Sequence, residues 1–123
     1  MVFHAQPVLY SADLRACAAM SALDPDRVTA TFVHALESAG ATVVQALSHN
    51  FPGAGQTCVL ILAESHAILH TWPETGTVNI DIFSCSTRLK SLAAIAELGQ
   101  LFGAAGVSVL EIPRADGHGP PPD

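Results

Sequence analysis

The segment that most constrains the fold is the alternating run over residues 77–85. Val78, Ile80 and Ile82 are apolar, the residues between them are more polar, and this period of two is typical of a β-strand with one buried face. The apolar face of such a strand has to be covered by other elements. We therefore expect helices on one face of a sheet and, on the more polar face, room for a functional site.

Two segments show the helical periodicity that could provide this cover. Asp24 is a predicted N-cap, Pro25 suits the first helical position, and this helix is expected to end at Gly40. Ser86 or Thr87 is predicted to cap the second helix. The buried stripe of the second helix is expected at Leu89, Leu92, Ile95, Leu98 and Leu101 or Phe102.

The remaining regular segments are short and apolar. An edge strand is predicted over residues 7–10, and one or two helical turns over residues 12–20. Further strands are expected over 42–47, 58–63, 67–72 and 107–112. The sequence thus predicts an α+β fold, a two-layer α/β sandwich with a mainly antiparallel sheet and two helices on one face, in the order β-α-β-β-β-α-β. The chain has 123 residues, which suits a single domain over 1–116 and a disordered tail over 117–123.

Charge and cysteine usage narrow the choice of partners. The formal net charge is -6, with five Lys and Arg in all, so nucleic acid and anionic membranes are disfavoured and a small cationic substrate would be attracted. No apolar run approaches the roughly 18 residues that cross a bilayer. The three cysteines are widely spaced, which favours reduced thiols and a cytoplasmic location. Only 13% of residues are charged, which leaves surface for a partner subunit to cover.

Residues 63–85 combine several reactive side chains in a short stretch. A hydroxyl, two imidazoles and a thiol occur at Ser65, His66, His70 and Cys85. Taken alone, Ser65 could be a turn residue and Cys85 a small buried apolar residue. His66 and His70 would share one face of a strand and could bind zinc with Cys85, although no second pair such as CxxC supports that site.

The order and spacing of three motifs in this stretch are more specific than any single residue. The motifs are Glu64-Ser65-His66, the run His70-Thr71-Trp72-Pro73-Glu74, and the alternate residues Asp81, Phe83 and Cys85. With Gly40-Ala41-Thr42, His49 and Phe51, they resemble the small bacterial and archaeal class of S-adenosylmethionine decarboxylase proenzymes.

The resemblance implies that the chain cuts itself between Glu64 and Ser65, giving a β chain of residues 1–64 and an α chain of residues 65–123. The Ser65 hydroxyl would attack the Glu64 carbonyl and convert the amide into an ester. β-Elimination and hydrolysis would then leave a pyruvoyl group in place of Ser65. That cofactor would form a Schiff base with the substrate amine and accept electrons as carbon dioxide leaves. No metal is implied.

The resemblance also assigns roles to five further side chains. His70 would transfer a proton during processing, assisted by the hydroxyl of Thr57, and Cys85 would reprotonate the substrate carbon. Phe51 would stack on the adenine, and Glu74 would bind the ribose hydroxyls. The implied product is the aminopropyl donor for spermidine synthesis, and the implied assembly is a homodimer of processed protomers.

Two other functions and one geometric question stay open at this stage. The same scaffold could carry a pyruvoyl-dependent ornithine or arginine decarboxylase acting on a dibasic amino acid, or a regulatory paralogue that does not process. Ser65 and His70 would lie roughly 16 Å apart on opposite faces of a fully extended strand. They could meet only if the chain turns near Ser65 or if a partner subunit supplies the contact.

Overall fold

The sheet has six antiparallel strands in the order β2-β3-β4-β5-β1-β6. A computed structural model describes residues 6–53, 55–85 and 89–116. Its strands are β1 (Val8–Arg15), β2 (Val43–Asn50), β3 (Gln56–Leu62), β4 (Ser65–Trp72), β5 (Thr77–Ser84) and β6 (Gly106–Pro113). Four strands therefore lie between the two helices along the chain, one more than in the predicted order β-α-β-β-β-α-β. The predicted tail over 117–123 lies outside the described residues.

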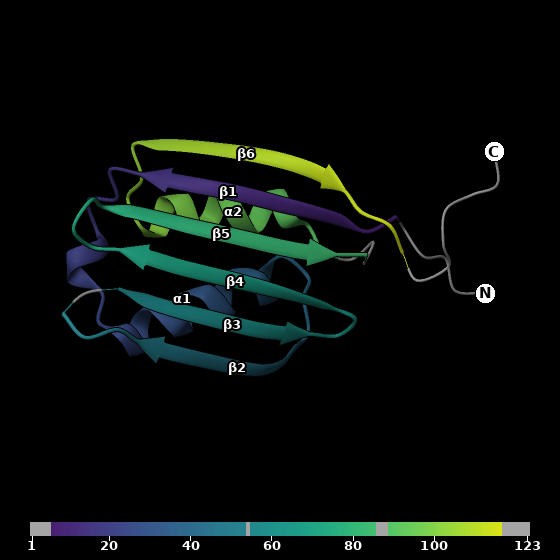
Figure 1. The fold of residues 1–123 in the computed structure, drawn as a ribbon, viewed down its shortest axis with the longest axis horizontal. Coiled ribbons are helices and arrows are strands. Elements are labelled where there is room, and N and C mark those ends of the chain that lie inside the picture. Colours follow the sequence, from purple (N-terminus) through teal and green to yellow (C-terminus); the bar gives the residue numbers. More distant parts are fainter. Residues whose placement is uncertain (1–5, 54, 86–88, 117–123) are drawn as a thin grey trace.

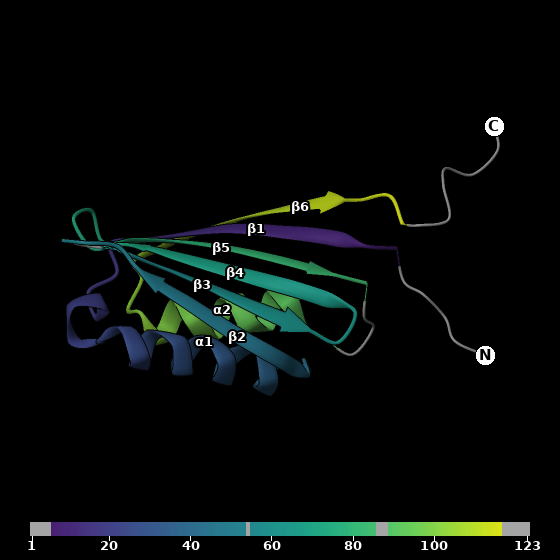
Figure 2. The ribbon, with the colours of Figure 1, turned by 60° about the horizontal axis from the view of Figure 1, so that its bottom comes forward.

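Both helices cover the same face of the sheet, α1 (Pro25–Ser38) and α2 (Ser91–Leu101) lying side by side beneath it (Figures 1 and 2). Apolar side chains fill the space between the layers, and Phe32 and Phe102 are the largest that are fully buried. Val78, Ile80 and Ile82 are also fully buried. The predicted two-layer α+β sandwich is thereby confirmed.

The first helix begins as predicted. The side chain of Asp24 accepts a hydrogen bond from the backbone amide of Arg27 at 2.9 Å, and Pro25 occupies the first turn, where a missing N–H costs nothing. Its C-terminal end is followed by Gly40 in the left-handed region, with φ 105°.

The prediction for the N-terminal segment was wrong in two respects. β1 extends to Arg15, so residues 12–15 are strand and not helix, because Ala12 and Leu14 alternate into the core at 2% and 0% exposure. β1 also lies between β5 and β6 and is not an edge strand. The only helical turn described near there is a 3₁₀ turn over Met20–Ala22.

The second helix begins later than predicted, at Ser91 with Lys90 as its N-cap, whereas the predicted caps Ser86 and Thr87 lie outside the described residues. Its buried positions are Ser91, Ala94, Ile95, Leu98 and Gly99. Leu92 is 50% exposed, so including it in the stripe was wrong. Of the two alternatives for the last position, Phe102 is fully buried and Leu101 is 42% exposed.

Candidate active site

The predicted catalytic residues gather at the two ends of β4 and its neighbouring strands. Glu64, Ser65 and Cys85 lie at one end, which we call the serine end. Phe51, Thr57, His70 and Glu74 lie at or near the other, which we call the histidine end. In Figure 1 the serine end is at the β3–β4 turn, and the histidine end is at the opposite end of the strands, where β4 passes into β5.

A strained residue forms the turn at the serine end. Leu62 pairs with Ser65, so only Ala63 and Glu64 connect β3 to β4. Glu64 has φ 64°, in the left-handed region that favours glycine or asparagine. Among the described non-glycine residues only Ala16 shares this property, with φ 52°. Such a conformation costs on the order of 1–2 kcal/mol, and here it adjoins the Glu64–Ser65 bond.

The serine end also holds a hydroxyl and a thiol beside that bond. Within the described part of the chain, the Ser65 oxygen is buried and has no hydrogen-bond partner. The Cys85 thiol donates a hydrogen bond to the Glu64 carbonyl oxygen at an Sγ···O distance of 3.5 Å. The β4–β5 register explains this contact, because His66 pairs with Phe83 and two further steps bring Cys85 beside Glu64. The hydroxyl that is predicted to attack Glu64 and a donor to the Glu64 carbonyl are thus supplied by β4 and by the residue that directly follows β5.

At the histidine end, Thr57 and His70 are direct cross-strand partners on β3 and β4. A hydrogen bond of 2.7 Å joins Thr57 Oγ1 to His70 Nδ1. This contact leaves Nε2 as the ring nitrogen available for other partners. The pair therefore provides a fixed imidazole that could accept or donate a proton.

Aromatic rings surround this imidazole. The ring of Trp72 lies 4.4 Å from that of His70 between centroids, and the ring of Phe51 lies 5.8 Å away. Phe51 also contacts His49 edge to face at 4.7 Å and is 44% exposed. An exposed aromatic ring beside an imidazole can offer a stacking surface to a flat ligand. Glu74 is exposed in the turn between β4 and β5, at this same end of the sheet.

The two ends do not meet within one chain. Ser65 through Trp72 form one uninterrupted strand, so about 16 Å separates Ser65 from His70 at roughly 3.3 Å per residue. Their side chains also point to opposite faces, because Ser65 shares its face with buried Ala67 and Leu69. Of the two routes considered from the sequence, a turn of the chain near Ser65 is therefore excluded.

The open face of the sheet carries a row of polar side chains that crosses all six strands. The row is defined by the strand register and consists of His49, Thr57, His70, Asn79, Asp13 and Ser108. Sequence reasoning gave no site role to Asp13 or Trp72. Only the register could have revealed them, and register is a property of the folded sheet.

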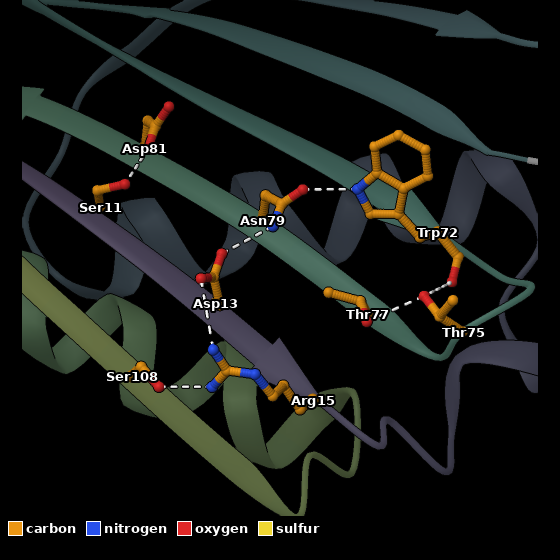
Figure 3. A network of polar contacts seen from close by, with 9 residues as sticks. All are labelled: Ser11, Asp13, Arg15, Trp72, Thr75, Thr77, Asn79, Asp81 and Ser108. Atoms are coloured by element: carbon orange, nitrogen blue, oxygen red, sulfur yellow. Dashed lines mark hydrogen bonds and ion pairs between the residues drawn. The ribbon is translucent and has the colours of Figure 1, made fainter.

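Asp81 lies in the middle of β5, away from both ends. Asp81 accepts a hydrogen bond from the Ser11 hydroxyl at 2.8 Å (Figure 3). Burial raises the pKa of the Cys17 thiol, which keeps this thiol protonated and unreactive at neutral pH. Among the residues that the structure describes, no three His, Cys, Asp or Glu side chains are grouped to hold a metal ion, so zinc binding by His66, His70 and Cys85 gains no support. No described helix is long and apolar enough to span a membrane.

Comparison with known proteins supports the resemblance read from the motifs. The model of the S-adenosylmethionine decarboxylase family matches residues 9–115. An S-adenosylmethionine decarboxylase proenzyme of Acidithiobacillus ferrooxidans is 36% identical over 103 residues, which cover 84% of this chain and 77% of the relative. One from Methanococcus maripaludis is 31% identical over 102 residues, covering 83% and 84%. The crystal structure of the adenosylmethionine decarboxylase from Aquifex aeolicus shares the fold, with a TM-score of 0.80, 21% identity and coverage of 98% and 100%.

Proposed function

Because the chain belongs to the S-adenosylmethionine decarboxylase family, we propose that it is a self-processing, pyruvoyl-dependent decarboxylase of S-adenosylmethionine. Its product would be the aminopropyl donor for spermidine synthesis. The observation that carries this proposal is the serine end. There Glu64 is strained, the Ser65 hydroxyl has no partner among the described residues, and the Cys85 thiol donates to the carbonyl of the bond between them. The family match does not favour ornithine or arginine as the substrate.

The serine end suits the first step of processing. Attack of the Ser65 oxygen on the Glu64 carbonyl forms a C–O bond and breaks the C–N bond, and charge develops on the carbonyl oxygen. The Cys85 thiol already donates to that oxygen. Opening the peptide bond also releases the left-handed constraint on Glu64, which favours the product. The main-chain carboxylate of Glu64 would then be eliminated from the ester, and hydrolysis with loss of ammonia would convert residue 65 into the pyruvoyl group.

The residues at the serine end fit the pyruvoyl group that this conversion would create. The buried Ser65 oxygen has no partner to lose among the described residues, and Cys85 directly follows the neighbouring strand β5. A pyruvoyl carbonyl acts as an electron sink when a carboxylate leaves the carbon beside an amine. Cys85 would supply the proton that replaces the carboxylate.

A second copy of the chain would supply the missing imidazole. His70 and Thr57 cannot reach Ser65 of their own chain, and the open face exposes apolar side chains such as Leu110, at 68%, and Leu47, at 52%. A homodimer that covers this face would bury these side chains. Because the Ser65 side chain points to the other face, the histidine end of one protomer would have to approach the β3–β4 turn of its partner from the end of the strands. Phe51 and Glu74 would then bind the adenosine at that joint site. The free thiols of Cys17, Cys58 and Cys85 suit a reducing, cytoplasmic location.

The test is the denatured intact mass of the purified protein, followed by assay with carboxyl-labelled substrates. We expect two chains, 1–64 and 65–123, the second blocked at its N-terminus, and labelled carbon dioxide from S-adenosylmethionine. A single uncut chain after prolonged incubation would favour a regulatory paralogue. Cut protein that releases label only from ornithine or arginine would overturn the substrate assignment but not the chemistry.

A further inference from the structure

A chain of hydrogen bonds runs across the open face toward His70. The Asn79 amide nitrogen donates to Asp13 Oδ1 at 2.7 Å, and the Trp72 indole nitrogen donates to Asn79 Oδ1 at 2.6 Å (Figure 3). Asn79 is also the direct cross-strand partner of His70. It therefore lies beside the imidazole while its side chain is committed to the two neighbours, Asp13 and Trp72.

The bonding pattern permits only one orientation of the Asn79 amide. A carboxylate only accepts hydrogen bonds when ionised, and an indole N–H only donates them, so the amide NH₂ must face Asp13 and the carbonyl must face Trp72. Arg15 holds Asp13 from the other side, with a nitrogen-to-oxygen distance of 3.7 Å, and itself donates to the Ser108 hydroxyl. Asn79 is thus anchored to β1 and β6 at one end and to β4 at the other.

Trp72 needs such an anchor because little else holds it. Its side chain is 44% exposed, and its indole lies on the open face against the His70 ring, with centroids 4.4 Å apart and planes inclined at 57°. Thr57 holds the His70 ring only through Nδ1, which leaves rotation about that contact to be limited by the neighbouring rings. The position of the indole, together with that of the Phe51 ring, therefore limits the orientation of the imidazole.

We propose that Asn79 is a positioning residue that links Asp13 to Trp72 and so holds the Trp72 indole against the His70 imidazole. Its effect on the reaction passes entirely through Trp72, since Asn79 makes no hydrogen bond to His70 among the described contacts. The inference rests on the proposed function, in which His70 transfers a proton during processing.

The first readout is independent of catalysis. Trp72 is the single tryptophan of the chain, so one indole N–H resonance reports on the bond to Asn79. In the uncleavable Ser65→Ala protein, Asn79→Ala and Asp13→Asn should shift that resonance, and Asn79→Ala should speed its exchange with solvent. Ser11→Ala, which removes the hydrogen bond to Asp81 on the same face, should leave it unchanged. An indole resonance unaffected by Asn79→Ala would overturn the proposal.

The second readout is the rate of self-cleavage in a double-mutant cycle. Asn79→Ala should slow cleavage about fivefold in the otherwise natural chain, the loss expected for one hydrogen bond. In a Trp72→Phe background, which keeps an aromatic ring but has no N–H, the same change should have no further effect. An equal loss in both backgrounds would show a general structural role and refute positioning through Trp72.

The two failures are distinguishable. If the natural chain does not cut itself, the proposed function fails, while the indole measurements still decide whether Asn79 anchors Trp72. If the chain cuts but Asn79→Ala cleaves at the natural rate, the proposed function stands and the positioning role fails. Should Asn79→Ala not fold, Asp13→Asn replaces it in the double-mutant cycle, because it weakens the hydrogen bond that Asn79 donates to Asp13.

Discussion

The serine end and the histidine end of β4 are held in place by opposite means. At the serine end the backbone is strained at Glu64 and the Ser65 oxygen lacks a described partner. At the histidine end the backbone is ordinary strand, and His70 is fixed by side chains on three sides, at Thr57, Trp72 and Phe51. The contrast suits a division of work in which one end changes covalently and the other keeps its geometry.

Removing the nucleophile should have the largest effect. We expect Ser65→Ala to abolish cleavage and all decarboxylation, because no hydroxyl remains to attack Glu64. Intact mass spectrometry should show only the full-length chain. Ser91→Ala is the matched control, since its oxygen is also buried without a described partner but lies on α2, and this variant should cleave normally.

Mixing two inactive variants tests whether the two ends come from different chains. His70→Ala and Ser65→Ala should each stay uncut alone. In a mixed dimer, the intact serine end belongs to the His70→Ala chain and the intact histidine end to the Ser65→Ala chain, so cleavage should reappear in the His70→Ala chain. Fragment masses identify which chain was cut. Absence of any fragment from verified mixed dimers would place both ends in one chain.

The Thr57 hydroxyl should contribute a smaller but clear factor. Thr57→Val keeps the branched shape, removes the hydrogen bond to His70 and should slow cleavage about tenfold. Thr57→Ser keeps the hydroxyl and should remain near the natural rate. A time course of fragment formation separates the two variants, and equal rates would show that the 2.7 Å contact plays no part in processing.

Relieving the strain at the serine end should have the smallest effect. In the Ser65→Ala background, Glu64→Gly should stabilise the folded protein by about 1 kcal/mol, because glycine adopts positive φ without steric cost. Chemical denaturation measures the change. Glu74→Gly, in a turn where no positive φ is found at the glutamate, should give no such gain. A loss of stability at position 64 would argue against strain there.

Local patterns in the sequence were sufficient for the parts of the fold that depend on local physics. The alternation at Val78 and Ile80 and the cap at Asp24 were readable because each depends on residues a few positions away. The central place of β1 was not readable, because it is decided by pairing with strands that are distant in the sequence, as in the pairs Leu14–Val78 and Arg15–Gly106. Leu92 was misassigned because the predicted stripe advanced in steps of three residues, whereas the buried positions of α2 follow the 3.6-residue helical period.

The candidate site also contains features that the sequence could predict and features that it could not. Ser65, His70 and Cys85 could be proposed from the sequence because their motifs lie close together in it, and the family match supports the assignment of the chain. The sequence already raised the question of how Ser65 and His70 could meet. Only the structure, in which both belong to one uninterrupted strand, shows that they do not meet within one chain. The link from Asp13 through Asn79 to Trp72 was invisible, because it joins three strands through a register that the sequence does not specify.

The strand order determines what would become of the sheet if the chain is cut as proposed. Residues 1–64 contain β1, β2 and β3, and residues 65–123 contain β4, β5 and β6, yet the sheet runs β2-β3-β4-β5-β1-β6. β1 of the first piece is inserted between two strands of the second, so the pieces are interlocked along three ladders (Figure 1). Cleavage would leave the two pieces associated in one folded protein. The new chain end would stay at the start of β4 for as long as the sheet remains folded.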